Sequence, residues 1–174
     1  EHLDATEGAL ERMNRIIDDL LWLAQEGQDI GSVEPVDIQE TVTAAWCLVA
    51  DNKEQAELRC ADGELDADTI IADSDRLRQL LENLFRNAIK HGGEEVTITI
   101  GTENERFYVE DDGPGISPDE RDDVFDAGYT TANDGTGLGL SIVQRIVAAH
   151  DWEVCVTEGS AGGARFVITG VEFV

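Results

Sequence analysis

The sequence predicts an α+β protein, a two-layer α/β sandwich in which helices cover one face of a mixed β-sheet, preceded by one long helix. Two observations support this fold class. Amphipathic helical segments are interspersed with short segments in which hydrophobic and polar residues alternate. The chain has 174 residues, 41% of them hydrophobic, which is enough for one substantial core.

Four helices are expected, and the first, over residues 3–24, has an unusual apolar seam. The seam steps by three and four residues through Leu3, Thr6, Leu10, Met13, Ile17, Leu20 and Ala24. Because further leucines widen it, we expect a protruding dimerisation helix; a helix packed on its own domain is the alternative. The other helices are expected at residues 37–50, with Asp37 as N-cap, at 74–91 and at 139–150.

Six strands are expected between and after these helices. They cover residues 57–60, 69–72, 96–100, 107–110, 153–157 and 165–169. Residues 111–135 are rich in Gly, Pro, Asp and Thr and form a long loop with one short helical turn. A loop of this length inside a compact domain is usually functional.

The charge of the chain excludes some classes of partner. It has 38 acidic against 12 basic residues, a net charge of −26. This balance argues against nucleic-acid binding and against docking on anionic lipid. Concentrated salt would screen the self-repulsion, so we expect a halophilic protein, as in haloarchaea; an acidic mesophilic domain is the alternative.

Cysteine usage and hydropathy indicate a cytoplasmic piece of a larger protein. The three cysteines form no C-x-x-C pair and are interpreted as reduced thiols. No segment is predicted to span a bilayer and no signal peptide opens the chain. The chain begins within a helical pattern, so we expect it to be cut from a longer protein, which could be membrane-anchored.

The helix at 74–91 places polar residues beside its apolar stripe. Asn83, Asn87 and Lys90 fall together on its flank. A carboxamide oxygen suits Mg²⁺ and a lysine ammonium suits phosphate, so this flank could line a pocket. A solvated helix flank is the alternative.

Two glycine-rich segments follow. Asp111 ends a strand and precedes Gly113 and Gly115, so its carboxylate could accept a hydrogen bond from an exocyclic amine such as that of adenine; a plain turn is the alternative. The segment from Gly135 to Leu140, G-T-G-L-G-L, leads directly into a helix. Backbone N–H groups and the helix N-terminus there could hold phosphate without basic side chains. The spacing fits neither a P-loop nor a Rossmann motif.

In this order along the chain, the three motifs resemble the ATP-binding catalytic domain of sensor histidine kinases, in the superfamily of the topoisomerase and chaperone ATPases. Residues 80–91 match the N box, 111–115 the first glycine box and 135–140 the second, and 124–129 resemble the F box. The resemblance covers residues 36–170 and implies the Bergerat ATP-binding fold. Residues 1–26 resemble the second helix of the family's dimerisation hairpin, which leaves 27–35 as a linker and 36–174 as the catalytic domain.

The resemblance implies ATP and Mg²⁺ as cofactors. Asn87 would coordinate the metal, Lys90 would contact the phosphates, and Asp111 would bind the adenine amino group. Asn83 stands where hydrolytic relatives carry a Glu that activates water, which favours transfer to a side chain; catalytic roles are expected for Asn83 and Lys90. Residues 117–134 would form a mobile lid. The expected nucleotide-binding residues are Asn83, Asn87, Lys90, His91, Asp111, Gly113, Gly115, Ile116, Thr130, Thr131, Gly135, Thr136, Gly137, Leu138, Gly139 and Leu140.

The implied activity is transfer of the ATP γ-phosphoryl group to a histidine, for relay to an aspartate of a response regulator, within a homodimer. The family's acceptor histidine is followed by an acid and usually by a proline, a pattern that His2 does not fit. The acceptor is therefore expected on a helix absent from this chain. A nucleotide-binding signalling module without kinase activity is the main alternative. Asn83 speaks against an ATP hydrolase, and the leading helix speaks against an anti-sigma-type serine kinase.

Overall fold

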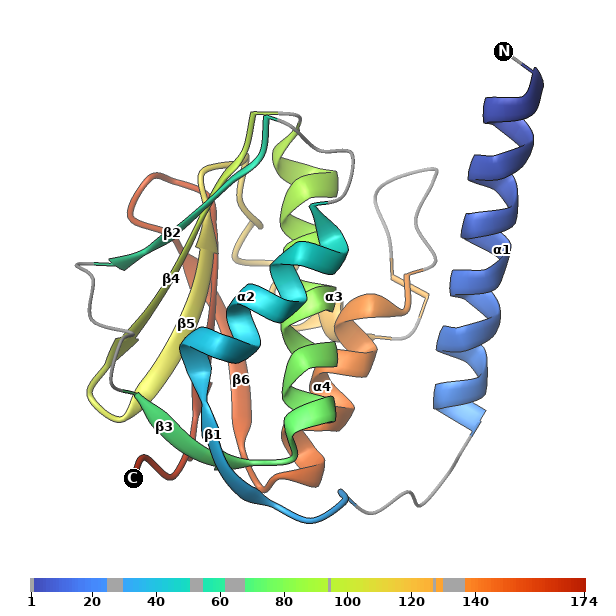
Figure 1. The fold of residues 1–174 in the computed structure, drawn as a ribbon. Helices are drawn as coiled ribbons and strands as arrows, with labels where there is room; N and C mark the ends of the chain where they lie inside the picture. Colours follow the sequence, from blue (N-terminus) through green and yellow to red (C-terminus); the bar gives the residue numbers. More distant parts are fainter. Residues whose placement is uncertain are drawn as a thin grey trace.

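The computed structural model describes residues 2–24, 30–50, 55–61, 68–93, 95–126, 128–129 and 137–174. Figure 1 shows the long first helix beside a sandwich of helices and sheet. The elements in chain order are α1 (His2–Ala24), β1 (Glu34–Asp37), α2 (Ile38–Val49), β2 (Glu57–Cys60), β3 (Thr69–Ala72), α3 (Ser74–Gly92), β4 (Thr97–Glu103), β5 (Arg106–Asp111), the 3-10 helix η2 (Asp123–Phe125), α4 (Gly139–Ala149), β6 (Glu153–Glu158) and β7 (Ala164–Thr169).

The main sheet is mixed, and helices cover one of its faces. Its strand order is β2-β4-β5-β7-β6, with β2 parallel to β4 and every other pair antiparallel. The helices α2, α3 and α4 lie on the same side of this sheet (Figure 1). The predicted two-layer architecture is confirmed.

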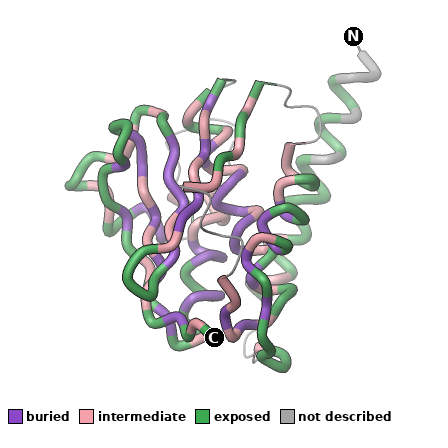
Figure 2. Tube along the Cα trace, turned by 60° about the vertical axis from the view of Figure 1, so that its left-hand side comes forward, coloured by how far each residue is buried: buried purple, intermediate pink, exposed green. Residues whose placement is uncertain are grey.

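The core lies between these two layers, where Figure 2 shows the buried residues concentrated. The stripe predicted on α3 is buried, and Leu77, Leu80, Leu81 and Leu84 are at most 1% exposed. The sheet contributes the inward-facing residues of its central strands, among them Ile98, Val109 and Phe166. This packing fixes the rotation of α3 and therefore the direction in which its polar flank faces.

The strand β1 was not expected from the sequence. It pairs antiparallel with β3 in a separate two-stranded sheet. Pro35 lies within this strand, where a proline is tolerated because the strand is at a sheet edge. The helix start itself was predicted correctly, since the Asp37 carboxylate accepts a hydrogen bond from the Glu40 N–H at 2.9 Å.

The helix α1 leaves most of its apolar seam uncovered. Leu10, Met13, Ile17 and Leu20 are between 49% and 59% exposed. The C-terminal end of α1 contacts the sandwich through Trp22, whose ring centroid lies 5.3 Å from the Arg76 guanidinium. The dimerisation helix stays a prediction, and so does its alternative, a helix packed on its own domain. Across the described residues, no helix combines the length and apolarity required to span a bilayer.

Candidate functional site

The motifs singled out in the sequence lie along the second half of α3. The end of β5 lies near the C-terminal end of this helix, and the start of α4 lies beside its middle (Figure 1). A Cβ atom added to Gly113 would lie 2.8 Å from the Gly92 Cα, and one added to Gly139 would lie 3.4 Å from the Asn83 Oδ1. The asparagine helix therefore contacts both glycine-rich segments.

The polar flank of α3 has the orientation that the sequence predicted. Asp73 caps the helix by accepting hydrogen bonds from the N–H groups of Asp75 and Arg76 at 3.1 and 3.2 Å. Asn83 is buried, and its Nδ2 donates to the Gln79 carbonyl at 2.9 Å. Asn87 is half-buried, and its side chain has no hydrogen-bond partner within the described part of the chain. Lys90 lies exposed on the last turn.

Asp111 is buried, and one of its two carboxyl oxygens has hydrogen-bond partners within the described residues. Its Oδ1 accepts hydrogen bonds from the Gly113 N–H at 2.9 Å and the Ala164 N–H at 3.3 Å. Among the described residues, no donor reaches its Oδ2. Burial raises the pKa of Asp111, although the two backbone donors oppose this change. Although the residue is buried, its Oδ2 is not fully enclosed, so this oxygen can accept a hydrogen bond from a ligand.

The glycines after Asp111 allow close backbone packing. Gly113 lies against the end of α3, and Gly115 has φ of +77°. A Cβ on Gly115 would lie 2.8 Å from the Gly162 carbonyl oxygen. Ile116 is half-buried and packs on the core, so it is positioned behind this turn. The first glycine box is therefore a close-packed unit.

A third glycine-rich segment touches the site, and the sequence analysis missed it. The turn between β6 and β7, residues 159–163, has the sequence G-S-A-G-G. A Cβ on Gly163 would lie only 1.9 Å from the Asp111 carbonyl oxygen, so this turn packs directly on Asp111. The repeated glycines were the available signal, but a hairpin turn explains them equally well.

The second glycine box is partly described. Gly137 has φ of +68°, and its carbonyl accepts a hydrogen bond from the Gly128 N–H at 2.9 Å. Leu138 precedes α4, which begins at Gly139 and Leu140, and no side chain caps this helix start within the described residues. Thr130, Thr131, Gly135 and Thr136, together with part of the expected lid, lie outside the described residues.

His91 lies near Asp111 but is not expected to carry charge at neutral pH. Partial loss of solvent lowers the pKa of His91, and Lys90 lowers it further, whereas Asp111 acts in the opposite direction. Lys90 is therefore the one cation that the predicted site residues supply within the described part of the chain. The region around the expected phosphates carries little positive charge.

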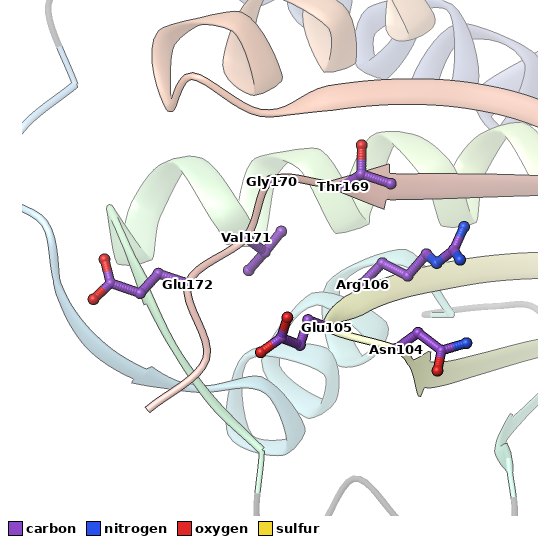
Figure 3. A pocket seen from close by; sticks show the side chains of 7 residues that line it. All are labelled: Asn104, Glu105, Arg106, Thr169, Gly170, Val171 and Glu172. Atoms are coloured by element: carbon purple, nitrogen blue, oxygen red, sulfur yellow. The ribbon is translucent and has the colours of Figure 1, made fainter.

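A shallow hollow elsewhere on the molecule does not coincide with this site. It has a volume of about 440 Å³ and lies between the β4–β5 turn and the segment after β7 (Figure 3). Arg106, which lines it, begins β5, whereas Asp111 ends the same strand. The hollow is therefore roughly 17 Å from the predicted site, at the rise of an extended strand.

Comparison with known proteins identifies the fold and its family. Residues 72–171 match the family described as histidine kinase-, DNA gyrase B-, and HSP90-like ATPase. The chain belongs to this ATPase family. The predicted resemblance to this family and the prediction of an ATP-binding domain are confirmed.

The similar relatives of this ATPase domain are sensor histidine kinases. The sensor histidine kinase ZraS of Salmonella typhi is 36% identical over 165 residues, which cover 91% of this chain and 35% of that kinase. The chain thus spans about a third of the length of this curated relative. This ATPase domain is of the kind found in sensor histidine kinases.

Solved structures of histidine kinases contain a domain with the same fold. Full-length ShkA in complex with AMPPNP is 32% identical, with a TM-score of 0.80 over 99% of this chain and 39% of that chain. The histidine kinase ThkA in complex with the response regulator protein TrrA shares the fold at 22% identity, with a TM-score of 0.72 over 99% of this chain and 50% of that chain.

Proposed function

We propose that this ATPase domain is the catalytic part of a sensor histidine kinase that binds ATP with Mg²⁺. In the whole protein it transfers the γ-phosphoryl group to a histidine on a dimerisation helix absent from this chain. A response regulator then accepts the group on an aspartate. The observation that carries the proposal is that α3 lies against both glycine-rich segments, at Gly92 next to Gly113 and at Asn83 next to Gly139, in a domain of this family.

The donor set fits a magnesium ion that arrives with the nucleotide. The Asn87 carboxamide has no hydrogen-bond partner among the described residues, and an amide oxygen is a hard ligand for Mg²⁺. No group of three or more His, Cys, Asp or Glu residues could hold a metal among the residues described. Asn87 would therefore hold the ion together with phosphate and water oxygens, and the ion would supply the positive charge that this acidic chain lacks.

Asn83 supports phosphoryl transfer over hydrolysis. Its side chain is fixed by the bond to Gln79 and lies against Gly139 at the start of α4. A carboxamide cannot accept a proton from water as a carboxylate can, so Asn83 orients groups but does not generate a nucleophile. Lys90 contributes charge near the phosphates. The protein thus acts by positioning and charge neutralisation.

Transfer to a supplied acceptor tests this proposal. The chain is incubated with γ-labelled ATP, Mg²⁺ and a dimerisation-helix fragment of a related sensor histidine kinase. We expect acid-labile label on the fragment and none with the Asn87→Ala chain. Binding of ATP without transfer would favour the signalling module instead. Steady phosphate release by the chain alone, lost in Asn83→Ala, would favour a hydrolase.

We also propose that α1 pairs with a second copy of the chain. Its exposed Leu10, Met13, Ile17 and Leu20 repeat at the spacing of a bundle seam. The division into a hairpin helix at 1–26, a linker at 27–35, a catalytic domain at 36–174 and a lid at about 117–134 belongs to the same proposal. Sedimentation velocity should show a dimer that Ile17→Glu dissociates, while the exposed control Ala44→Glu on α2 leaves it intact.

A further inference from the structure

Glu110 is a buried acid that the proposed mechanism does not use. It immediately precedes Asp111 on β5, and because strand side chains alternate it faces the opposite side of the sheet. Its side chain is only 9% exposed. A carboxylate this deep is tolerated only when it is well paired, so its partners matter.

Arg165 on β7 is the main partner of Glu110. The two residues are directly opposite in the β5–β7 register, and the Arg165 Nε donates to the Glu110 Oε2 at 2.7 Å. The guanidinium also lies over the Tyr108 ring, 4.1 Å from its centroid, and 3.9 Å from the Glu103 carboxylate. Arg165 is therefore held from three sides.

Ser160 links this pair to the β6–β7 turn. Its Oγ donates to the Glu110 Oε1 at 2.7 Å and its N–H donates to the Oε2 at 3.2 Å. Burial by itself raises the pKa of Glu110, but the hydrogen bonds from Arg165 and Ser160 outweigh burial and lower it. The ionised carboxylate therefore holds the turn through two bonds to one residue.

The same turn contacts Asp111 from the other side. Gly163 packs on the Asp111 backbone, and the Ala164 N–H donates to the Asp111 Oδ1. The bond between the Gly159 N–H and the Gly163 carbonyl, at 2.7 Å, closes the turn. A displacement of Ser160 would thus move the donor that orients the Asp111 carboxylate.

We propose that Glu110 and Arg165 are positioning residues that hold the β6–β7 turn against Asp111 and so set the preference of the site for adenine nucleotides. The inference rests on the proposed function, because it assumes that Asp111 reads the base. Neither residue touches the nucleotide; both act through the turn and the Ala164 N–H.

Calorimetric affinities for ATP and inosine triphosphate, which lacks the amino group, test the inference. In Glu110→Gln and Arg165→Met the ratio of the two affinities should fall about three- to tenfold, as expected for a misaligned hydrogen bond. Arg165→Lys should recover part of the ratio. Arg78→Gln removes an arginine that is ion-paired on α3 and should keep the full ratio.

Hydrogen exchange in the nucleotide-free protein provides a second readout. Exchange of the Ala164 amide should accelerate in Glu110→Gln, and less so in Ser160→Ala, which deletes one exposed hydroxyl and keeps the fold. A stable Ser160→Ala or Glu110→Gln variant with an unchanged affinity ratio and unchanged Ala164 exchange would overturn the inference. A wild-type chain that binds neither nucleotide would instead overturn the proposed function.

Discussion

The two ends of the proposed nucleotide site are built differently. At the base end, Asp111 is buried, two backbone donors fix its Oδ1, and three glycines pack against it or its neighbours. At the phosphate end, Asn87 has no intramolecular partner among the described residues, and no described side chain caps α4. In the proposed site, the base end is therefore preorganised by the fold, whereas Asn87 at the phosphate end would take its partners from the ligand.

The largest expected effect is at the base end, from Gly163→Ala. The added Cβ would lie 1.9 Å from the Asp111 carbonyl oxygen, so backbone must move. We expect a loss of about 3 kcal/mol in the free energy of unfolding, measured by denaturant, and loss of ATP binding. Gly162→Ala, in open space but with φ of +84°, is the control and should cost about 1–2 kcal/mol. Equal effects of the two variants would contradict close packing on Asp111.

Asn87→Ala tests the phosphate end. The variant should weaken ATP binding in Mg²⁺ by roughly tenfold or more, because one metal ligand is lost. In EDTA the same variant should bind almost as the wild type does, as measured by calorimetry. The fold should be unaffected, since Asn87 makes no described hydrogen bond. Losses of ATP affinity of the same size with Mg²⁺ and in EDTA would contradict the role of Asn87 as a metal ligand.

Asp111→Asn should reduce the preference for ATP over inosine triphosphate more than it reduces the affinity for purine triphosphates in general. Replacing the acceptor Oδ2 by an amide should weaken ATP about tenfold and inosine triphosphate little. Asn retains an oxygen for the Gly113 and Ala164 donors, so the turn should persist. Competition binding of the two triphosphates measures the ratio. An unchanged ratio would assign base reading to another group.

The smallest expected effect is on pH dependence. Burial raises the pKa of Asp111, so ATP affinity should begin to fall on acidification at a higher pH than for an ordinary aspartate. The free energy of unfolding should change with pH in the opposite direction. A carboxyl group whose pKa is raised in the folded state stabilises the fold while it is protonated, and this contribution is lost as the pH rises through that pKa. Asp111→Asn should therefore raise the neutral-pH Tm of the nucleotide-free chain, by at most about 4 °C. A lowered Tm would indicate that the charge is stabilised by a partner.

The sequence predicted those parts of the fold and site that depend on local pattern. The apolar stripe of α3 is buried as predicted, and the Asp37 cap marked the start of α2. The strand β1 was missed because four residues containing Pro35 give no alternation to detect. The salt adaptation expected from the charge stays a prediction.

The parts that were missed at the site depend on contacts between distant segments. Glu110 and Ser160 are 50 residues apart, and nothing in the spacing of either indicates that they meet. The strand register brings these residues together, because β5 and β7 are neighbours and Arg165 lies opposite Glu110. Motifs along the chain therefore predicted the groups of the proposed site, but not the groups that hold them in place.

The C-terminal tail, residues 170–174, limits how far an expression fragment of this domain can be shortened. Its backbone continues the small sheet: the Ile71 N–H donates to the Glu172 carbonyl at 3.0 Å, and the Val174 N–H donates to the Thr69 carbonyl at 2.9 Å. Both contacts join residues outside 72–171, the stretch matched by the family. An expression fragment trimmed to that stretch would discard β1, α2 and both partners of the tail, exposing the apolar surface that α3 buries against α2. The autonomous folding unit is thus wider than its family signature.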